Sequence, residues 1–185
     1  MATKSISLNR RLSADLDRAF PVFVAEMQAA VFNGARRWLP SRQDAEDVTQ
    51  EVFVRAYRAL QGYEPQRIAE LRLRPWLFAI TLNLCRNQAR TRSRRPTQVA
   101  LNGADGAANA GTEQSALEGL AVDEWRERLS RLSARQRDAI VLRHVVDMGY
   151  DEIGEVLGRP AGTVKSDVHR GLKRLRDIIE MEESS

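Results

Sequence analysis

The chain is poor in cysteine, because Cys85 is the only one among its 185 residues. A single thiol forms no internal disulfide, and its neighbours lack the spacing of a metal site. No apolar run approaches the ~18 residues that a transmembrane helix needs, and residues 1–12 lack the apolar segment of a secretory signal. We therefore expect a cytoplasmic protein without membrane insertion and without a bound metal.

Signals of catalysis are also missing from the sequence. The two histidines, His144 and His169, are not accompanied by a recognisable nucleophile motif, and there is no glycine-rich phosphate loop. The acidic residues show no spacing that is peculiar to metal ligation. We therefore expect a protein that is not an enzyme, has no catalytic residues and needs no cofactor.

Alternation of apolar and polar residues with the period of a strand is rare, whereas helical spacing recurs along the whole chain. Aromatic residues make up only 6% of the sequence and apolar residues 43%, which suits modest helical cores. The formal charge of +4 is unevenly spread, because residues 96–124 contain no lysine or arginine. This pattern predicts an all-α protein with two polyanion-binding lobes joined by an acidic connector.

Breaks in the helical pattern suggest where these lobes lie. We expect an N-terminal extension over residues 1–16, a first domain over 17–95, a flexible linker over 96–113 and a second domain over 114–180. The linker is rich in alanine, glycine and asparagine and has little to bury. In the first domain the spacing predicts helices near 17–38, 44–60 and 75–92, with Pro21 acceptable only in a first turn.

Residues 150–179 have the pattern of a helix-turn-helix. Gly158 suits the end of a short helix and Pro160 the start of the next. The second helix has an apolar side formed by Val164, Val168, Leu172, Leu175 and Ile179. The polar side, which would enter a DNA major groove, comprises Lys165, Ser166, His169, Arg170, Lys173 and Arg174. An ordinary amphipathic helical hairpin is the alternative interpretation.

The helix that follows Pro75 carries a second candidate DNA surface. Its polar residues fall within about 100° of arc on the side of a tryptophan, and the set is Trp76, Asn83, Arg86, Asn87 and Arg90. Asparagine can hydrogen-bond base edges, arginine can contact phosphates, and tryptophan offers a stacking face. The set therefore favours single-stranded or distorted DNA. The alternative is an arginine cluster stabilised by the helix dipole.

The helix over 44–60 presents a candidate protein-docking surface. Opposite its apolar side lie Asp47, Gln50, Glu51 and Val54. An aliphatic side chain inside a charged rim is typical of a docking site. A single exposed valine is, however, also common on ordinary surfaces.

Several segments resemble the extracytoplasmic-function sigma factors of the sigma-70 family. Residues 44–53 (DAEDVTQEVF) and 74–83 (RPWLFAITLN) resemble their region 2. Residues 132–138 (LSARQRD), 150–154 (YDEIG) and 162–166 (GTVKS) resemble their region 4. The motifs occur in the family's order, and the resemblance covers about residues 17–95 and 114–179. It implies a dissociable, non-catalytic subunit of bacterial RNA polymerase that selects promoters and starts transcription.

The resemblance also implies roles for individual positions. Asp47, Gln50 and Glu51 match residues that dock on the clamp helices of the largest polymerase subunit. Asn83 matches a reader of the melted −10 non-template strand, and residues 63–72 match the loop that captures a flipped base. In region 4, the positions that match those facing the −35 duplex are Lys165, Ser166, His169 and Arg170.

The expected partners are therefore core RNA polymerase and promoter DNA. An anti-sigma factor is a further candidate, because such factors commonly cover both domains in this family. Two alternatives stay open from the sequence. One is a stand-alone helix-turn-helix regulator, and the other is an interaction protein that sequesters its partners through helical faces.

Overall fold

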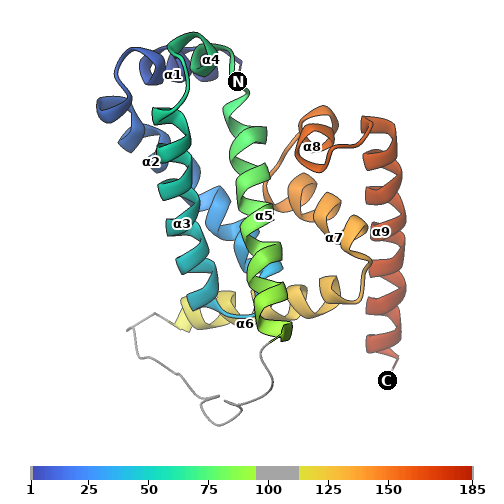
Figure 1. Ribbon diagram of the computed structural model, residues 1–185. Helices are drawn as coiled ribbons and strands as arrows, with labels where there is room; N and C mark the ends of the chain where they lie inside the picture. Colours follow the sequence, from blue (N-terminus) through green and yellow to red (C-terminus); the bar gives the residue numbers. More distant parts are fainter. Residues whose placement is uncertain (1, 95–112, 185) are drawn as a thin grey trace.

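The computed structural model describes residues 2–94 and 113–184, and every regular element within them is helical (Figure 1). The first lobe contains α1 (Ala2–Ala14), α2 (Leu16–Trp38), α3 (Arg42–Gln61), α4 (Pro65–Glu70) and α5 (Leu73–Arg94). The second contains α6 (Glu113–Ser130), α7 (Ala134–Ile140), the π-helix η1 (Val141–Val145), α8 (Tyr150–Leu157) and α9 (Ala161–Glu183). The predicted all-α class is confirmed. The expected linker lies outside the described residues, apart from Glu113, which begins α6.

Local side-chain caps explain where the helices of the first lobe begin. The side chain of Asp15 accepts a hydrogen bond from the backbone N–H of Arg18, 3.0 Å away, at the start of α2. Ser41 accepts one from the N–H of Asp44 over 3.1 Å at the start of α3. Each cap satisfies one of the backbone donors that a helix leaves unpaired in its first turn. The helices α2, α3 and α5 then pack around buried side chains that include Phe23.

Pro21 does not lie where the sequence suggested. It is the sixth residue of α2, counted from Leu16, and therefore lies in the second turn. There its ring nitrogen cannot donate the backbone hydrogen bond to Asp17, which costs about 3 kcal/mol in a helix interior. The side chain is exposed, so the ring takes no place in the core. The expectation of a first-turn proline was wrong, because the cap is Asp15 and not a later residue.

The N-terminal segment, which had no assigned role, forms α1. Leu8 and Leu12 of this helix are buried in the core of the first lobe. Figure 1 shows α1 and α4 lying together at one end of the molecule. Residues 8–14 are thus part of the folded first lobe.

The second lobe contains one departure from regular α-helix. Ser133 and Gln136 form a capping box at the start of α7. The helical path then changes to a π-helix at Val141. Asp147 follows with φ 59°, a left-handed conformation that aspartate tolerates better than most side chains. This turn places Met148 fully inside the core.

The predicted helix-turn-helix is formed by α8 and α9. Gly158 ends α8 with φ 64°, as its left-handed C-cap requires. Gly154 lies against the returning chain, so a Cβ atom there would be 2.6 Å from the carbonyl oxygen of Arg159. The tight turn therefore depends on both glycines, and it fixes the start of α9 against α8.

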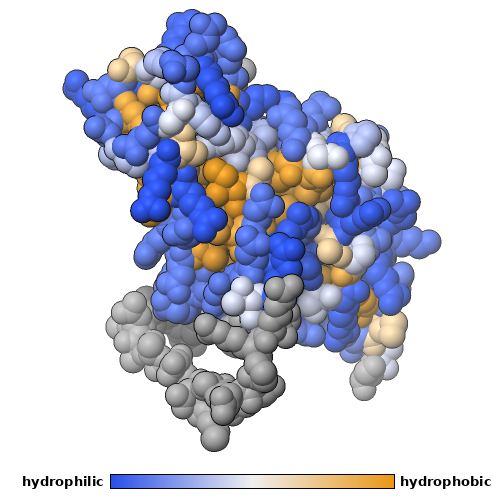
Figure 2. Space-filling model, viewed as in Figure 1, coloured by the Kyte–Doolittle hydropathy of each residue, from blue (hydrophilic) through white to orange (hydrophobic). Residues whose placement is uncertain are grey.

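The two lobes pack against each other and share one apolar core. Phe78 of α5 belongs to the same buried cluster as Met148 and Ile153 of the second lobe. Arg74 donates hydrogen bonds to the carbonyl oxygens of Val146 and, over 3.1 Å, Asp147. Figure 2 shows apolar surface across the middle of this face, between α3 and α5 and beside α5 toward the second lobe. The described part of the chain is therefore a closed arrangement of both lobes.

Candidate DNA-binding and docking surfaces

The first half of α9 exposes the residues predicted to contact duplex DNA. Its inward side buries Val164, Val168 and Leu175, which leaves the opposite side in solvent. All six predicted residues are exposed there: Lys165, Ser166, His169, Arg170, Lys173 and Arg174. The helix therefore presents a continuous basic face with hydrogen-bonding groups between the charges.

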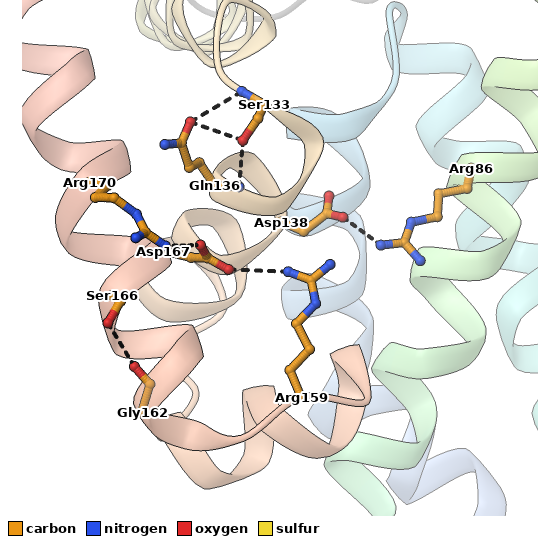
Figure 3. Close-up of polar contacts among 9 residues, drawn as sticks. All are labelled: Arg86, Ser133, Gln136, Asp138, Arg159, Gly162, Ser166, Asp167 and Arg170. Carbon is orange, nitrogen blue, oxygen red and sulfur yellow. Dashed lines mark hydrogen bonds and ion pairs between the residues drawn. The ribbon is translucent and has the colours of Figure 1, made fainter.

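A buried aspartate organises the start of this basic face (Figure 3). The carboxylate of Asp167 is only 8% exposed and accepts hydrogen bonds from Arg159, at 3.2 Å, and Arg170, at 2.8 Å. Charge-assisted bonds of this kind are roughly twice as strong as neutral ones. Asp167 thus ties the turn before α9 to the exposed guanidinium of Arg170. The sequence reasoning missed this pair, although an acidic residue between basic ones was a visible signal.

The predicted single-strand surface follows α5. Asn83, Arg86, Asn87 and Arg90 are all exposed along one side of this helix. Arg90 donates a hydrogen bond to the side-chain oxygen of Asn87 over 2.6 Å. Arg86 forms an ion pair with Asp138 of α7, shown in Figure 3. The structure therefore brings these four residues together, but it also engages one of them with the second lobe.

Trp76 lies apart from the four, at the other end of α5, where an open cavity of about 690 Å³ separates α4 from α5. It lines this cavity with Arg67 and Leu71, and its ring is half-buried against Tyr63, with the ring centroids 6.2 Å apart. The guanidinium of Arg67 lies 3.7 Å from the centroid of the Tyr63 ring. Flat aromatic and guanidinium groups next to a cavity of this size can hold an unstacked base.

The second lobe closes one side of this cavity. Glu155 of α8 is among the lining residues and forms an ion pair with Arg72, which directly precedes α5. Both side chains are about half exposed, so solvent screens the pair. The cavity therefore carries an acidic group from the second lobe only while the two lobes are packed together.

The predicted docking surface lies on α3. Asp47, Gln50 and Val54 are exposed, and Val54 keeps 42% of its surface in solvent. Glu51 is half-buried and forms an ion pair with Arg55 over 2.6 Å. A shallow pocket of about 270 Å³ between α3 and α5 is lined by Asp47, Glu51 and Asn87 together. The docking and single-strand surfaces are thus neighbours, which the sequence alone did not reveal.

The apolar side of α9 differs from the prediction at Leu172. This residue was assigned to the apolar side but is 42% exposed. It lines a groove of about 730 Å³ together with Trp125 and Leu129 of α6. Beside it, α7 lies close to α9 at Gly171, where a Cβ atom would be 2.6 Å from the side chain of Ile140. Leu175 is buried as predicted, whereas Ile178 is buried in place of the predicted Ile179, which is half-buried.

No cluster of three or more histidine, cysteine or acidic side chains in the described part of the chain could hold a metal ion. None of the described helices combines the length and apolarity needed to cross a membrane.

Comparisons with known proteins agree with the two-lobed arrangement. Residues 23–95 match the family described as Sigma-70 region 2, and residues 123–175 match Sigma-70, region 4. An RNA polymerase sigma-E factor of Streptomyces avermitilis is 35% identical over 161 residues, covering 87% of this chain and 85% of the relative. An ECF RNA polymerase sigma-E factor of Escherichia coli is 29% identical over 182 residues, covering 94% of this chain and 93% of the relative.

Two solved structures share the fold over most of the chain. CnrH, in complex with the cytosolic domain of CnrY, superposes with a TM-score of 0.72 at 27% identity, covering 96% of this chain and 97% of that one. The Bartonella quintana sigma factor RpoE, in complex with the anti-sigma factor NepR, gives 0.67 at 26% identity, covering 87% and 96%. A stand-alone helix-turn-helix regulator is not favoured, because region 2 matches as well as region 4. The chain belongs to the extracytoplasmic-function sigma factors of the sigma-70 family, as its motifs predicted.

Proposed function

We propose that this sigma factor directs core RNA polymerase to promoters through three of its surfaces. The exposed face of α9 binds the −35 duplex. The α5 face and the adjoining cavity bind the melted −10 strand, and the α3 face docks on the polymerase. The observation that carries this proposal is that the α9 set is exposed throughout, and that the α5 and α3 sets are exposed apart from the half-buried Trp76 and Glu51.

The −35 assignment is supported by the geometry of α9. An exposed helix with a basic polar face can enter a major groove, where arginine contacts guanine edges and lysine contacts phosphates. Arg170 is pre-oriented by Asp167 at 2.8 Å, which reduces the conformational entropy that binding would cost. Lys165, Lys173 and Arg174 are exposed beside it and suit phosphate contacts.

The −10 assignment is supported by the position of the cavity at the N-terminal end of α5. A melted strand that follows the polar face of α5 passes Asn87 and Asn83 before it reaches Trp76. A base turned out of the strand costs a few kcal/mol of unstacking, which stacking on an aromatic platform offsets. For Arg86 to join this surface, its ion pair with Asp138 has to break, so DNA binding through Arg86 removes a contact that holds the two lobes together.

The docking assignment is supported by the composition of the α3 face. Val54 contributes exposed apolar surface within a rim that includes Asp47 and Gln50. Such a centre and rim are typical of protein interfaces. The chain itself would contribute no catalytic group, and polymerase would carry out the chemistry. An anti-sigma factor is a further candidate partner, since the Bartonella quintana structure holds one.

The proposal is tested by gel filtration of the full chain mixed with sigma-free bacterial core RNA polymerase. Co-elution at equal stoichiometry is expected. Val54→Asp should reduce co-elution without changing the melting temperature, because the side chain is exposed. Failure of a folded wild-type chain to co-elute would contradict the docking assignment.

A further inference from the structure

Asn9 of α1 connects the N-terminal helix to the wall of the α4–α5 cavity. Its side-chain NH₂ group donates to the carbonyl oxygens of Ile68, at 3.0 Å, and Leu71, at 2.6 Å, with Ala69 at 3.4 Å. The side chain is buried, with 5% of the residue exposed. One amide therefore holds the backbone of residues 68–71, far away in the sequence.

The reason lies in the short helix α4. It spans only Pro65–Glu70, and the last carbonyl groups of a helix have no partner within it. Here the N–H of Leu71 reaches the carbonyl of Ile68 over 3.3 Å, and the carbonyls of Ala69 and Leu71 accept from Asn9 of α1. Leu8 and Leu12 anchor α1 in the core on either side of Asn9. The Asn9 amide is therefore held in a fixed position beside the C-terminal end of α4.

The hydrogen bonds that Asn9 donates contribute little net free energy to the stability of the fold. The side-chain oxygen of Asn9 is buried and has no hydrogen-bond partner among the described residues. An unsatisfied buried acceptor offsets much of what the donated hydrogen bonds contribute. The amide does, however, fix the position of the backbone where α4 turns toward α5, and this effect is not reduced by the unsatisfied oxygen.

That backbone forms one wall of the cavity. Arg67, Glu70 and Leu71 line it from the α4 side, opposite Trp76. A shift of the 68–71 backbone would carry Leu71 toward or away from Trp76 and change the width available to a flat base. The shape of the cavity is thus coupled to Asn9, which itself is not among the lining residues.

We propose that Asn9 is a positioning residue for the −10 strand, which sets the width of the cavity that receives an unpaired base by holding residues 68–71. This inference rests on the proposed function, in which the cavity between α4 and α5 takes that base. It gives α1 a role in promoter melting that lies outside the DNA surface itself.

The test uses holoenzyme reconstituted from the full chain and core polymerase, on a promoter selected from a randomised pool. An abasic nucleotide is placed in turn at each position of the non-template −10 strand, and open-complex lifetime is measured. With the wild-type chain, the open-complex lifetime should fall about tenfold when the abasic nucleotide is at the captured position, which is equivalent to about 1.4 kcal/mol. With Asn9→Leu, the open-complex lifetime on the intact template should be about tenfold shorter than with wild type. The abasic nucleotide should shorten the lifetime of this variant's complex almost no further.

Leu12→Ala is the matched control, because it removes a buried side chain of α1 and leaves the amide in place. It should lower the melting temperature while keeping the full abasic penalty. If Asn9→Leu does not fold, Asn9→Ala takes its place, and the same lifetimes are expected of it. A full abasic penalty in a folded Asn9 variant would overturn the role of Asn9. Absence of any abasic penalty in wild type would overturn base capture itself, a separate and recognisable failure.

Discussion

Arg86 and Asp138 form an ion pair between helices of the two lobes. The guanidinium of Arg86 on α5 lies 2.6 Å from the carboxylate of Asp138 on α7. The Asp138 side chain is 4% exposed, whereas that of Arg86 is 45% exposed. The guanidinium that we assign to the −10 strand is therefore engaged by the second lobe, so closure of the lobes and use of the α5 face exclude each other at this residue.

Asp138→Asn should make separation of the lobes easier. Loss of a charge-assisted bond whose partner is half exposed costs about 1 kcal/mol, which raises the ratio of open to closed molecules about fivefold. Energy transfer between dyes attached through Arg58→Cys and Glu180→Cys, in a Cys85→Ala background, measures this ratio. Asp151→Asn, at an exposed position of α8, is the control. Equal ratios in both variants would mean that the pair does not hold the lobes together.

Arg170→Ala should weaken −35 recognition. A base-directed arginine contributes about 1–3 kcal/mol, so a loss of about tenfold or more is expected. Competition between promoters with intact and altered −35 elements provides the measurement. Arg176→Ala is the control, since Arg176 lines the apolar groove on another side of α9. Unchanged discrimination in Arg170→Ala would remove this residue from the reading set.

Asp47→Arg should abolish binding to core polymerase while leaving the fold intact, because the side chain is exposed and the substitution reverses its charge. Co-purification with core enzyme and circular dichroism check the two halves of this prediction. Gln43 donates to the Asp47 carboxylate over 3.1 Å, so Gln43→Ala removes that contact and keeps the charge. Gln43→Ala should still bind, and a binding-competent Asp47→Arg chain would argue against the α3 face.

Gly154→Ala should destabilise the helix-turn-helix. The added Cβ atom would be 2.6 Å from the backbone carbonyl oxygen of Arg159, which cannot rotate away as a side chain can. Overpacking of this kind costs about 1–3 kcal/mol. Gly162→Ala meets nothing within 4 Å and should be neutral or slightly stabilising. Thermal unfolding compares the two, and equal melting temperatures would contradict the close approach.

Cys85 should resist thiol reagents in the folded protein. Burial, with a smaller effect from the charge of Asp138, raises the pKa of its thiol to about 12. Since the folded pKa lies above the unfolded value, the folded state keeps a proton that the unfolded state loses. Stability from this group is therefore complete below about pH 8.5 and is lost as pH rises toward 12. Labelling with a thiol reagent at pH 8 should follow global unfolding, and rapid labelling would contradict the burial.

Local pattern predicted the helices well where one face had to be buried. The spacing of Val164, Val168 and Leu175 fixed the orientation of α9, and hence the exposure of its basic side. The exposure of Leu172 was not predicted, because it depends on how α6 and α7 pack beside α9. Periodicity describes one helix at a time, so it does not give the distance between two.

Contacts between distant segments could not be predicted from the sequence for the same reason. Asn9 pairs with Ile68, and Arg74 with the carbonyl of Asp147, across long separations that leave no local signal. The π-helix before Asp147, whose carbonyl accepts from Arg74 of the first lobe, was likewise not predicted from the sequence. The sequence therefore predicted which residues lie on the exposed faces of α9 and α5, whereas the contacts that hold and partly cover these faces are visible only in the structure.

Run-off transcription tests the central claim most directly. Sigma-free core polymerase is mixed with the chain and a pool of templates whose upstream region is randomised, and the transcribed templates are sequenced. We predict transcripts that depend on the chain and arise from templates sharing two elements at a fixed spacing, one for each lobe. Transcription without such shared elements, or none from a folded chain that binds core enzyme, would contradict the account.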